Sequence, residues 1–248
     1  MAQPRIYYDN RLLDGNLVAS TTTAGTHVDN LTDWRSFTWW RPTTLPATVT
    51  VDCGSARSAD SLVVYGHDLF TRSGTIEVRG STDNFAASDV LVHSYAPPSD
   101  APFARSFTAV SYRYWRVRIT GSTPTPQLAI VAIGAAFDLD GYLSLDFDPI
   151  GRSAVGRVNR NEQGQPLGRV VDYVEQQQTI TMRRTTWDWL RNTFLPAWNA
   201  HLRATPFAWQ WNRTIDTDVR LVVAGDQLDT PHYPERQCDV TFTVRGVV

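Results

Sequence analysis

The stretch TWDWLRNTFLPAWNAHLRATPFAWQW, residues 186–211, contains five of the nine tryptophans and decides the architecture around it. Apolar residues recur in it at a spacing of three to four, the period of one helix face, at Trp187, Leu190, Phe194, Trp198 and Leu202. Residues 207–211 then alternate as a strand does. Strand-like segments lie on either side of this stretch. The pattern therefore predicts one helix packed across a β-sheet.

The ends and the middle of this helix carry further local signals. Thr185 or Thr186 is the expected N-cap, and Asp188 places a negative charge in the first turn, where the helix dipole favours it. Pro196 removes one helical hydrogen bond, which predicts a kink or a break at residues 192–195. Trp189 lies off the apolar stripe, so we expect it to reach a partner subunit.

The rest of the second half, residues 138–248, has the composition of an α+β domain. Strands are expected at 142–147, 169–183, 219–225 and 238–248, and Val240, Phe242 and Val244 share one face of the last one. The polar stretch 148–168 is too long for an ordinary hairpin turn. Two interpretations of it stay open: an arm that orders against a neighbouring subunit, or a solvent-exposed disordered loop.

The first half has a different pattern, in which short apolar or alternating runs are separated by Gly, Pro, Ser, Asp and Asn. The expected strands are 48–52, 61–66, 75–80, 89–95, 105–110, 114–120 and 128–137. No amphipathic helix of useful length lies among them. This spacing predicts an antiparallel β-sandwich or jelly roll over residues 16–137, preceded by an N-terminal arm over residues 1–15.

Several segments of this half resemble the galactose-binding-like, or discoidin, sandwich family. They are NLTDWRSFTWW (30–40), ATVTVDCGSARSADSLVVYGHDL (47–69), GTIEVRGSTDNFAASDVLVHS (74–94) and YRYWRVRIT (112–120). The positions that match the family pattern are Asn30, Leu31, Asp33, Asp52, Gly54, Val78, Ser81, Asp83, Trp115, Arg116, Val117 and Ile119. The resemblance implies the fold more specifically than it implies a ligand, because this sandwich hosts many unrelated sites.

In sugar-binding members of that family the ligand lies on loops at one end, against exposed aromatic rings and polar side chains. The resemblance implies such a glycan-binding set here at Trp34, Trp39, Trp40, Arg41 and His67, next to Asp68 and Phe70. The alternative is a structural role, in which the side chains of Trp39 and Trp40 point in opposite directions. One would then fill the base of the sandwich and the other would contact the next domain. Some members also hold calcium, for which Asn30 and Asp33 match, but no acidic cluster accompanies them, so no metal is predicted.

The order of elements in the second half resembles the hub domain of phage distal-tail and tail-tip proteins. The matching positions are Pro206, Phe207, Trp209 and the strand 240–244. The resemblance implies a homo-oligomeric ring of six or three copies that contacts tail-tube and tail-tip proteins. Arg152, Arg157, Arg160 and Trp189 are the predicted residues of the subunit interface.

Composition excludes several other classes of function. All 23 basic residues are arginine, a side chain suited to protein interfaces, while the net charge of −2 argues against nucleic-acid binding. No apolar run reaches the 18 residues of a membrane span, and the N-terminus lacks the apolar core of a signal peptide. Cys53 and Cys238 lie far apart and are expected to be separate reduced thiols.

A search for catalytic chemistry finds no nucleophile elbow, phosphate-binding loop, dinucleotide fingerprint or zinc-binding pair. The five histidines are scattered along the chain. The acidic residues Asp138, Asp140, Asp146 and Asp148 fit a linker turn better than a calcium loop or a glycosidase pair. The prediction is a protein that is not an enzyme and needs no cofactor.

These observations favour a structural virion protein at the distal tail of a tailed phage, assembled in the cytoplasm of the bacterial host. Its ring would join the tail tube to the tip, and its sandwich would brace neighbours or contact host surface glycan. The alternative is a carbohydrate-binding receptor-recognition protein without a ring-forming role.

Overall fold

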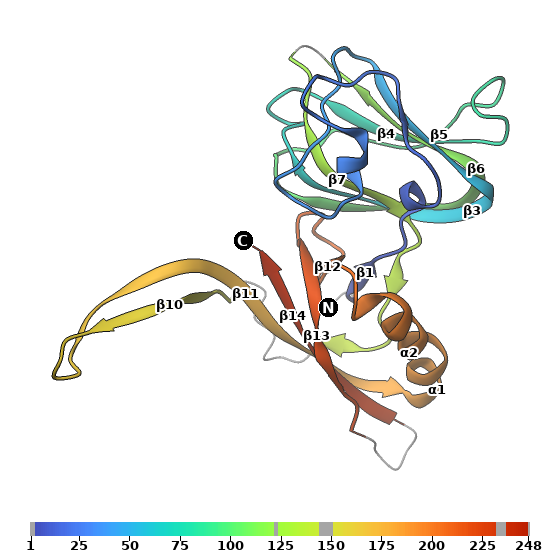
Figure 1. Ribbon diagram of the computed structural model, residues 1–248. Helices are drawn as coiled ribbons and strands as arrows, with labels where there is room; N and C mark the ends of the chain where they lie inside the picture. The colour runs from blue at the N-terminus through green and yellow to red at the C-terminus, as the bar shows by residue number, and fades with distance from the viewer. Residues whose placement is uncertain (1–2, 122–123, 144–150, 232–236, 248) are drawn as a thin grey trace. The chain divides into compact units, whose positions relative to one another are not determined.

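The computed structural model describes residues 3–121, 124–143, 151–231 and 237–247. Their contacts divide the chain into two units (Figure 1). The sandwich unit comprises Arg5–Phe137 with Asn212–Val219, and the second unit comprises Asp138–Trp211 with Arg220–Val248 and Met1–Pro4. The fold class is confirmed: the chain is mainly antiparallel β-structure, with a sandwich first and an α+β unit after it.

Two long strands form the frame of the sandwich unit. Strand β3 (Ala47–His67) pairs with β6 (Phe103–Thr120) from Ala47↔Ile119 to Val64↔Phe103, with a register shift between Asp52 and Arg57. The strands expected at 48–52 and 61–66 are therefore two halves of β3. Likewise, those expected at 105–110 and 114–120 are two halves of β6. An irregularity of this kind bends a strand, so that one strand can belong to both layers of the sandwich.

The shorter strands attach to one half or the other of this long pair. On the side before the shift, the order is β2 (Val18–Ala19), β3, β6, β4 (Thr75–Ser81) and β5 (Val90–Tyr95). After the shift, β7 (Leu128–Gly134) pairs with β3. Side chains from both halves, including Val49, Val51, Leu62, Val64 and Trp115, enter one buried core. Each large apolar side chain in such a core contributes about 1.5–3 kcal/mol of burial free energy.

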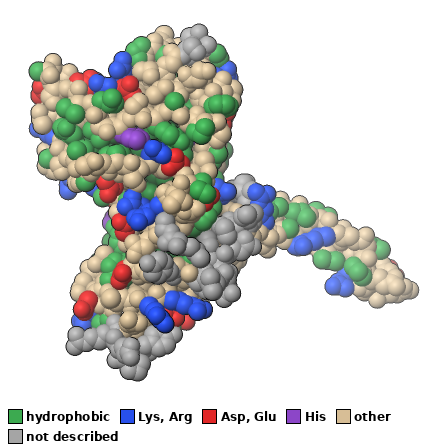
Figure 2. Space-filling view, turned by 180° about the vertical axis from the view of Figure 1, so that it is seen from behind, with side chains coloured by type: hydrophobic (Ala, Val, Ile, Leu, Met, Phe, Trp, Pro, Cys, Tyr) green, Lys and Arg blue, Asp and Glu red, His purple; other side chains and the backbone are tan. Residues whose placement is uncertain are grey.

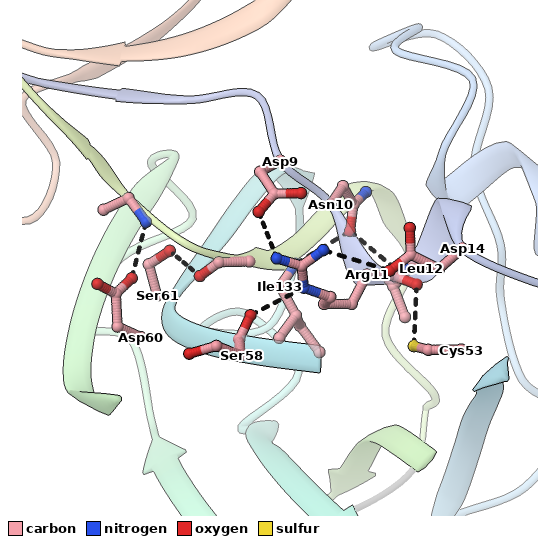
Figure 3. Close-up of polar contacts among 12 residues, drawn as sticks. Asp9, Asn10, Arg11, Leu12, Asp14, Cys53, Ser58, Asp60, Ser61 and Ile133 are labelled. Atoms are coloured by element: carbon pink, nitrogen blue, oxygen red, sulfur yellow. Dashed lines mark hydrogen bonds and ion pairs between the residues drawn. The ribbon is translucent and has the colours of Figure 1, made fainter. Parts of the chain in front are cut away.

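Part of the segment expected as an N-terminal arm packs into the sandwich. Asn10, which is buried, donates from Nδ2 to the carbonyl of Val131 at 3.1 Å. Its Oδ1 accepts from the amide of Ile133 at 3.1 Å (Figure 3). Arg11 donates from Nε to the carbonyl of Ser58 at 2.8 Å, and Leu12 is buried. Asn10 and Arg11 therefore satisfy backbone groups of β7 and β3.

The second unit is built on an antiparallel sheet. Its strands are β9 (Tyr142–Leu143), β10 (Ser153–Arg160), β11 (Pro166–Thr186), β12 (Phe207–Gln210), β13 (Val219–Asp229) and β14 (Gln237–Val247). They follow the order β10-β11-β14-β13-β12, and β9 also pairs with β11. The short strands β1 (Arg5–Tyr7) and β8 (Phe137–Asp138) lie where the chain passes between the units.

The helix of the second unit runs without a break from Trp187 to Leu202. It consists of α1 (Trp187–Trp189), a π-helical segment (Leu190–Phe194), α2 (Leu195–Ala197) and a second π-helical segment (Trp198–Leu202). The helix therefore has no break before Pro196, and residues 190–194 form a π-helical segment there. The wider hydrogen bonds of a π-helical turn accommodate the missing amide of proline. Thr186 is the N-cap, since its Oγ1 accepts from the amide of Trp189 at 3.3 Å.

One face of this helix packs on β14 through an aromatic cluster. The ring centroids of Phe194 and Trp198 lie 5.8 and 5.4 Å from that of Phe242, and all three side chains are buried. Val240 and Val244, on the same face of β14, are buried as well. The predicted helix stripe and the predicted strand face therefore meet each other, and this contact holds the helix on the sheet.

Gly134 offers a test of how the N-terminal segment is held. A Cβ atom added there would lie 1.6 Å from the backbone oxygen of Asp9, which cannot move aside as a side chain would. We expect Gly134→Ala to lower the free energy of unfolding of the sandwich by at least ~1–3 kcal/mol, the usual cost of overpacking. Urea unfolding followed by tryptophan fluorescence measures this change.

Gly168→Ala is the matched control, because nothing lies within 4 Å of the added Cβ and its φ is not positive. Its unfolding curve should overlay that of the wild type. Equal stability of Gly134→Ala and Gly168→Ala would contradict the close packing of the N-terminal segment on β7.

Candidate functional site

Loops that are distant in sequence meet at one end of the sandwich. The backbones of Trp40 and Leu128 exchange two hydrogen bonds of 2.8 and 3.0 Å. Arg41 donates from Nη2 to Oε1 of Gln127 at 3.0 Å, and Oδ1 of Asp68 accepts from the amide of Gln127 at 2.6 Å. These hydrogen bonds connect the loops that follow Leu31, His67 and Gly121.

A fourth loop joins this end through Asp100. Its carboxylate accepts from the amide of Phe70 at 2.9 Å and from the amide of Thr71 at 3.2 Å. Partial burial opposes ionisation of Asp100, but the hydrogen bonds from Thr71 and Phe70 prevail and hold its pKa below the usual value. The loop that presents Phe70 is therefore held by a charged carboxylate.

Two residues of the predicted glycan-binding set lie in the interior. Trp40 has no exposed surface, and its Nε1 donates to Oγ1 of Thr22 at 3.1 Å. His67 is buried as well: Nδ1 accepts from the amide of Leu69, and Nε2 lies 3.0 Å from the carbonyl of Ala101. Stacking on a sugar requires an accessible ring face, so this corrects the assignment of Trp40 and His67 to an exposed platform.

The other members of the set lie at the surface of this end. Trp39 keeps 40% of its surface exposed, Trp34 is half-buried, and Arg41 reaches the surface with part of its side chain. The structure adds Phe37, which is 72% exposed, and Phe70, which was expected beside the set, is exposed as well. We call Phe37, Trp39 and Phe70 the aromatic loop cluster. Sequence reasoning missed Phe37, because exposure within a loop leaves no periodic signal.

The residues that match calcium-binding members of the resembled family hold turns here. Asn30 donates from Nδ2 to the carbonyl of Trp39 at 2.9 Å. The carboxylate of Asp33 accepts from the amide of Arg35 at 2.9 Å and from Oγ1 of Thr38 at 2.7 Å. Across the part of the chain that the structure describes, no three His, Cys, Asp or Glu side chains form a group that would hold a metal ion.

In the second unit, strands β10 and β11 project from the sheet as a long hairpin (Figures 1 and 2). Its turn is ordered by Asn161, whose Oδ1 accepts from the amides of Gln163 at 3.1 Å and Gln165 at 2.8 Å. Of the two interpretations of the stretch 148–168, its described part thus takes the form of an arm. Residues 148–150 lie outside the described residues, as does Asp146.

The hairpin exposes apolar side chains on both of its faces. The register of β10 with β11 places Ala154, Val158, Val171 and Val174 on one face and Val155, Val170 and Tyr173 on the other. Tyr173 keeps 57% of its surface exposed, and Leu167, near the turn, keeps 70%. Green apolar patches alternate with blue arginines along the projecting hairpin in Figure 2. Among the described residues, nothing covers the apolar surface of this hairpin.

The predicted interface residues lie in different places. On the hairpin, Arg157 lies 4.0 Å from Asp172 and stays highly exposed, while Arg160 donates from Nη1 to the carbonyl of Gly164 at 2.9 Å and so supports the turn. Arg152 is exposed just before β10. Trp189 lies on the helix, half-buried with its ring 5.4 Å from that of Phe194. Their role in a subunit interface stays a prediction.

Comparison with known proteins identifies structural similarity to half of the chain. No family model matches the sequence, and no curated protein matches it. A chitosan-binding module of a chitosanase/glucanase from Paenibacillus sp. IK-5 is 22% identical, with a TM-score of 0.43; the match covers 50% of this chain and 97% of that module.

Two further solved structures give similar values. The CBM32 module of AlyQ, in complex with 4,5-unsaturated mannuronic acid, is 25% identical with a TM-score of 0.40, over 51% of this chain and 96% of the module. A CBM32 module from Clostridium perfringens, in complex with GalNAc-β-1,3-galactose, is 11% identical with a TM-score of 0.44, over 51% and 99%. All three of these structures are carbohydrate-binding modules. Separately, none of the helices in the described residues is long and apolar enough to cross a membrane.

His67 makes the stability of this end of the sandwich depend on pH. Burial lowers the pKa of His67 below the ordinary value of 6.5, so the unfolded chain takes up this proton first as the pH falls. The contribution of neutral His67 is therefore present above pH ~6.5 and is lost below it. We expect the stability difference between wild type and His67→Gln to be largest at pH 8 and to narrow at pH 5.

Urea unfolding at the two pH values measures this difference. His27→Gln, which changes an exposed histidine, is the control, and its difference from wild type should be small at both values. A His67→Gln difference that is constant with pH would show that His67 is not held as the neutral form.

Proposed function

We propose that this chain is a self-assembling structural protein, in which the β10–β11 hairpin of one copy docks on the next copy to close a ring. The observation that carries the proposal is the apolar surface on both faces of that hairpin. An isolated two-stranded ribbon is marginally stable in water, and three or more strands or a packing partner are normally needed. A projecting ribbon with exposed Leu167, Val171 and Tyr173 is therefore suited to a surface on another molecule.

A second copy of the chain is the partner that we propose for this hairpin. A hairpin that binds a different surface of an identical neighbour makes a head-to-tail contact, and such contacts generate rings when the rotation closes. Every hairpin in a closed ring is covered, so no apolar ribbon is left in water. The residue types agree with this use: Arg157, Arg160 and Arg169 lie on the same hairpin as Tyr173, and Arg and Tyr are enriched at protein interfaces.

We further propose that the ring belongs to the distal tail of a tailed phage, between the tail tube and the tip. The support is the order of elements in the second unit: strand β9, the β10–β11 hairpin, one helix, the strand β12 that begins at Phe207, and the closing strands β13 and β14. This is the order for which the sequence resembles tail-hub domains. The protein would then be a virion component that assembles in the bacterial cytoplasm beside tail-tube and tail-tip proteins.

Val171→Glu tests the assembly role of the hairpin. Val171 is 49% exposed, so a charge there leaves the fold intact but makes burial against a neighbour unfavourable. We expect the wild type to sediment as a closed oligomer of its 27.9 kDa chain and Val171→Glu to shift towards monomer, with at least ~10-fold weaker association. Sedimentation velocity over a concentration series gives both values.

Val90→Glu is the matched control, since Val90 is a strand valine of similar exposure (42%) in the sandwich unit. It should assemble as the wild type does. A wild type that stays monomeric, alone and with tail-tube protein, would overturn the ring proposal. Negative-stain images of the oligomer, and immunogold labelling of phage particles, test the ring and its place in the tail.

A second candidate function is carbohydrate recognition by the sandwich, and the aromatic loop cluster favours it. Phe37, Trp39 and Phe70 present apolar ring faces to solvent on loops held by hydrogen bonds. Arg41 lies beside them, and its Nε is buried without a hydrogen-bond partner in the described residues. Rings that stack and a side chain that donates hydrogen bonds are what a pyranose surface requires.

Trp39→Ala tests this second function on a glycan array. We expect it to weaken the wild-type glycan signal ~10-fold or more, because the stacking surface is lost. Leu13→Ala is the control, since Leu13 is an exposed apolar residue (53%) outside the cluster. An array on which wild type and Trp39→Ala give the same pattern would contradict glycan binding by the aromatic loop cluster.

A further inference from the structure

A separate cavity of about 750 Å³ lies on the outer face of the sandwich, over β2, β3 and β6. Its walls include Asn16, Thr50, Asp52, Tyr114 and Arg116, and Asn84 lines it from the loop between β4 and β5. None of these residues belongs to the aromatic loop cluster. Most of the lining carries hydroxyl, amide or charged groups, and the volume falls within the range of small-ligand sites. We call it the sheet-face groove.

Arginines on this face differ in how their charge is balanced. Arg113 forms a bidentate pair with Asp52, with both N–O distances 2.8 Å. Arg79 contacts Glu77 at 2.7 Å, and Arg118 lies 3.5 Å from the same carboxylate. Each of these three guanidinium groups therefore has a carboxylate partner. The pair with Arg113 also neutralises the charge of Asp52 at the rim of the groove.

Arg116 is the arginine of this face that has no such partner. Nε donates to Oγ1 of Thr50 at 2.9 Å, and the guanidinium carbon lies 3.6 Å above the centroid of the Phe85 ring. Among the described residues, no carboxylate forms an ion pair with it. Burial lowers the pKa of Arg116, while the charge of Asp89, whose carboxylate contacts Arg79 at 2.6 Å, acts in the opposite direction. The guanidinium is thus positioned without a direct ion pair.

The loop that completes the groove is held in a strained conformation. Asn84 and Phe85 have φ values of +57° and +63°, in the left-handed region that costs ~1–2 kcal/mol for a residue with a side chain. Asp83 stabilises the loop by accepting from the amides of Ala87 at 3.0 Å and Ser88 at 3.1 Å. This backbone conformation places Asn84 on the groove wall and Phe85 under Arg116. The strained loop therefore positions two residues of the groove.

We infer that the sheet-face groove binds an acidic saccharide, whose carboxylate pairs with Arg116 while its hydroxyls bond Asn16, Asn84 and Thr50. The planar guanidinium fork matches a carboxylate in two parallel hydrogen bonds. Hydroxyl and amide side chains both donate and accept, as a polyhydroxylated ring requires. A nucleic acid would need a series of unpaired cations along a backbone, whereas this groove offers one. The site is independent of the ring and of the aromatic loop cluster.

Calorimetric titration with tri-galacturonate tests the inference, with its methyl ester as the uncharged match. We expect the wild type to bind the acid, and Arg116→Gln to weaken that binding ~10-fold or more, the usual effect of losing a charged hydrogen-bonding pair. The methyl ester should bind the wild type as weakly as the acid binds Arg116→Gln. Arg118→Gln, on the same strand face but paired with Glu77, should bind within ~2-fold of wild type.

Asn84→Gly is a second variant that keeps the loop, because glycine adopts positive φ without strain. It should weaken binding by several-fold while the unfolding midpoint stays the same or rises. Absence of binding by the folded wild type at millimolar tri-galacturonate would overturn the inference. Equal affinity of wild type and Arg116→Gln, or of the acid and its ester, would overturn it too. Trp39→Ala should leave this binding unchanged, which separates the groove from the aromatic loop cluster.

Discussion

The pairing of β3 with β6 is the constraint on which the sandwich depends. Both strands cross from one layer to the other, so the register shift near Asp52 fixes where each layer begins and which shorter strand can attach to it. After this shift β3 pairs with β7, and the buried side chain of Asn10 forms two hydrogen bonds with the backbone of β7. A buried amide that donates to Val131 and accepts from Leu12 and Ile133 favours one arrangement, because any displacement would leave these polar groups unpaired in the core.

In the second unit, β11 has the corresponding role. Its part from Gln176 to Met182 alternates buried and exposed residues against β14, while its part from Pro166 to Val174 is exposed throughout as one side of the hairpin. A single strand therefore joins the sheet core to the proposed docking surface. The core end of β11 pairs with β14 from Glu175 to Thr186. Strand β14 in turn carries Phe242, which Phe194 and Trp198 contact, so the base of the hairpin belongs to the same sheet that holds the helix.

Sequence periodicity predicted the elements whose side chains face one core. The helix stripe through Phe194 and the face of β14 through Phe242 were both predicted and meet in the structure. Periodicity could not show that two expected strands were halves of β3, since a bend in a paired strand resembles a turn between two strands. It could not assign Trp40 either, because adjacent tryptophans leave open which one faces inward. The sequence identified Arg116 only as a position that matches the sandwich family, since its lack of a direct ion pair depends on its neighbours in space.

The position of Arg116 connects the fold to the proposed groove. Along β6, Trp115 and Val117 enter the core, and by the same alternation Tyr114 and Arg116 face the groove. The floor of the groove therefore lies on a strand that the core holds rigidly, which is how a site keeps its geometry before a ligand arrives. The wall around Asn84 is instead a loop held by the carboxylate of Asp83. Changes in ligand preference can then arise through that loop alone, because a change of register in β6 would move Trp115 out of the core.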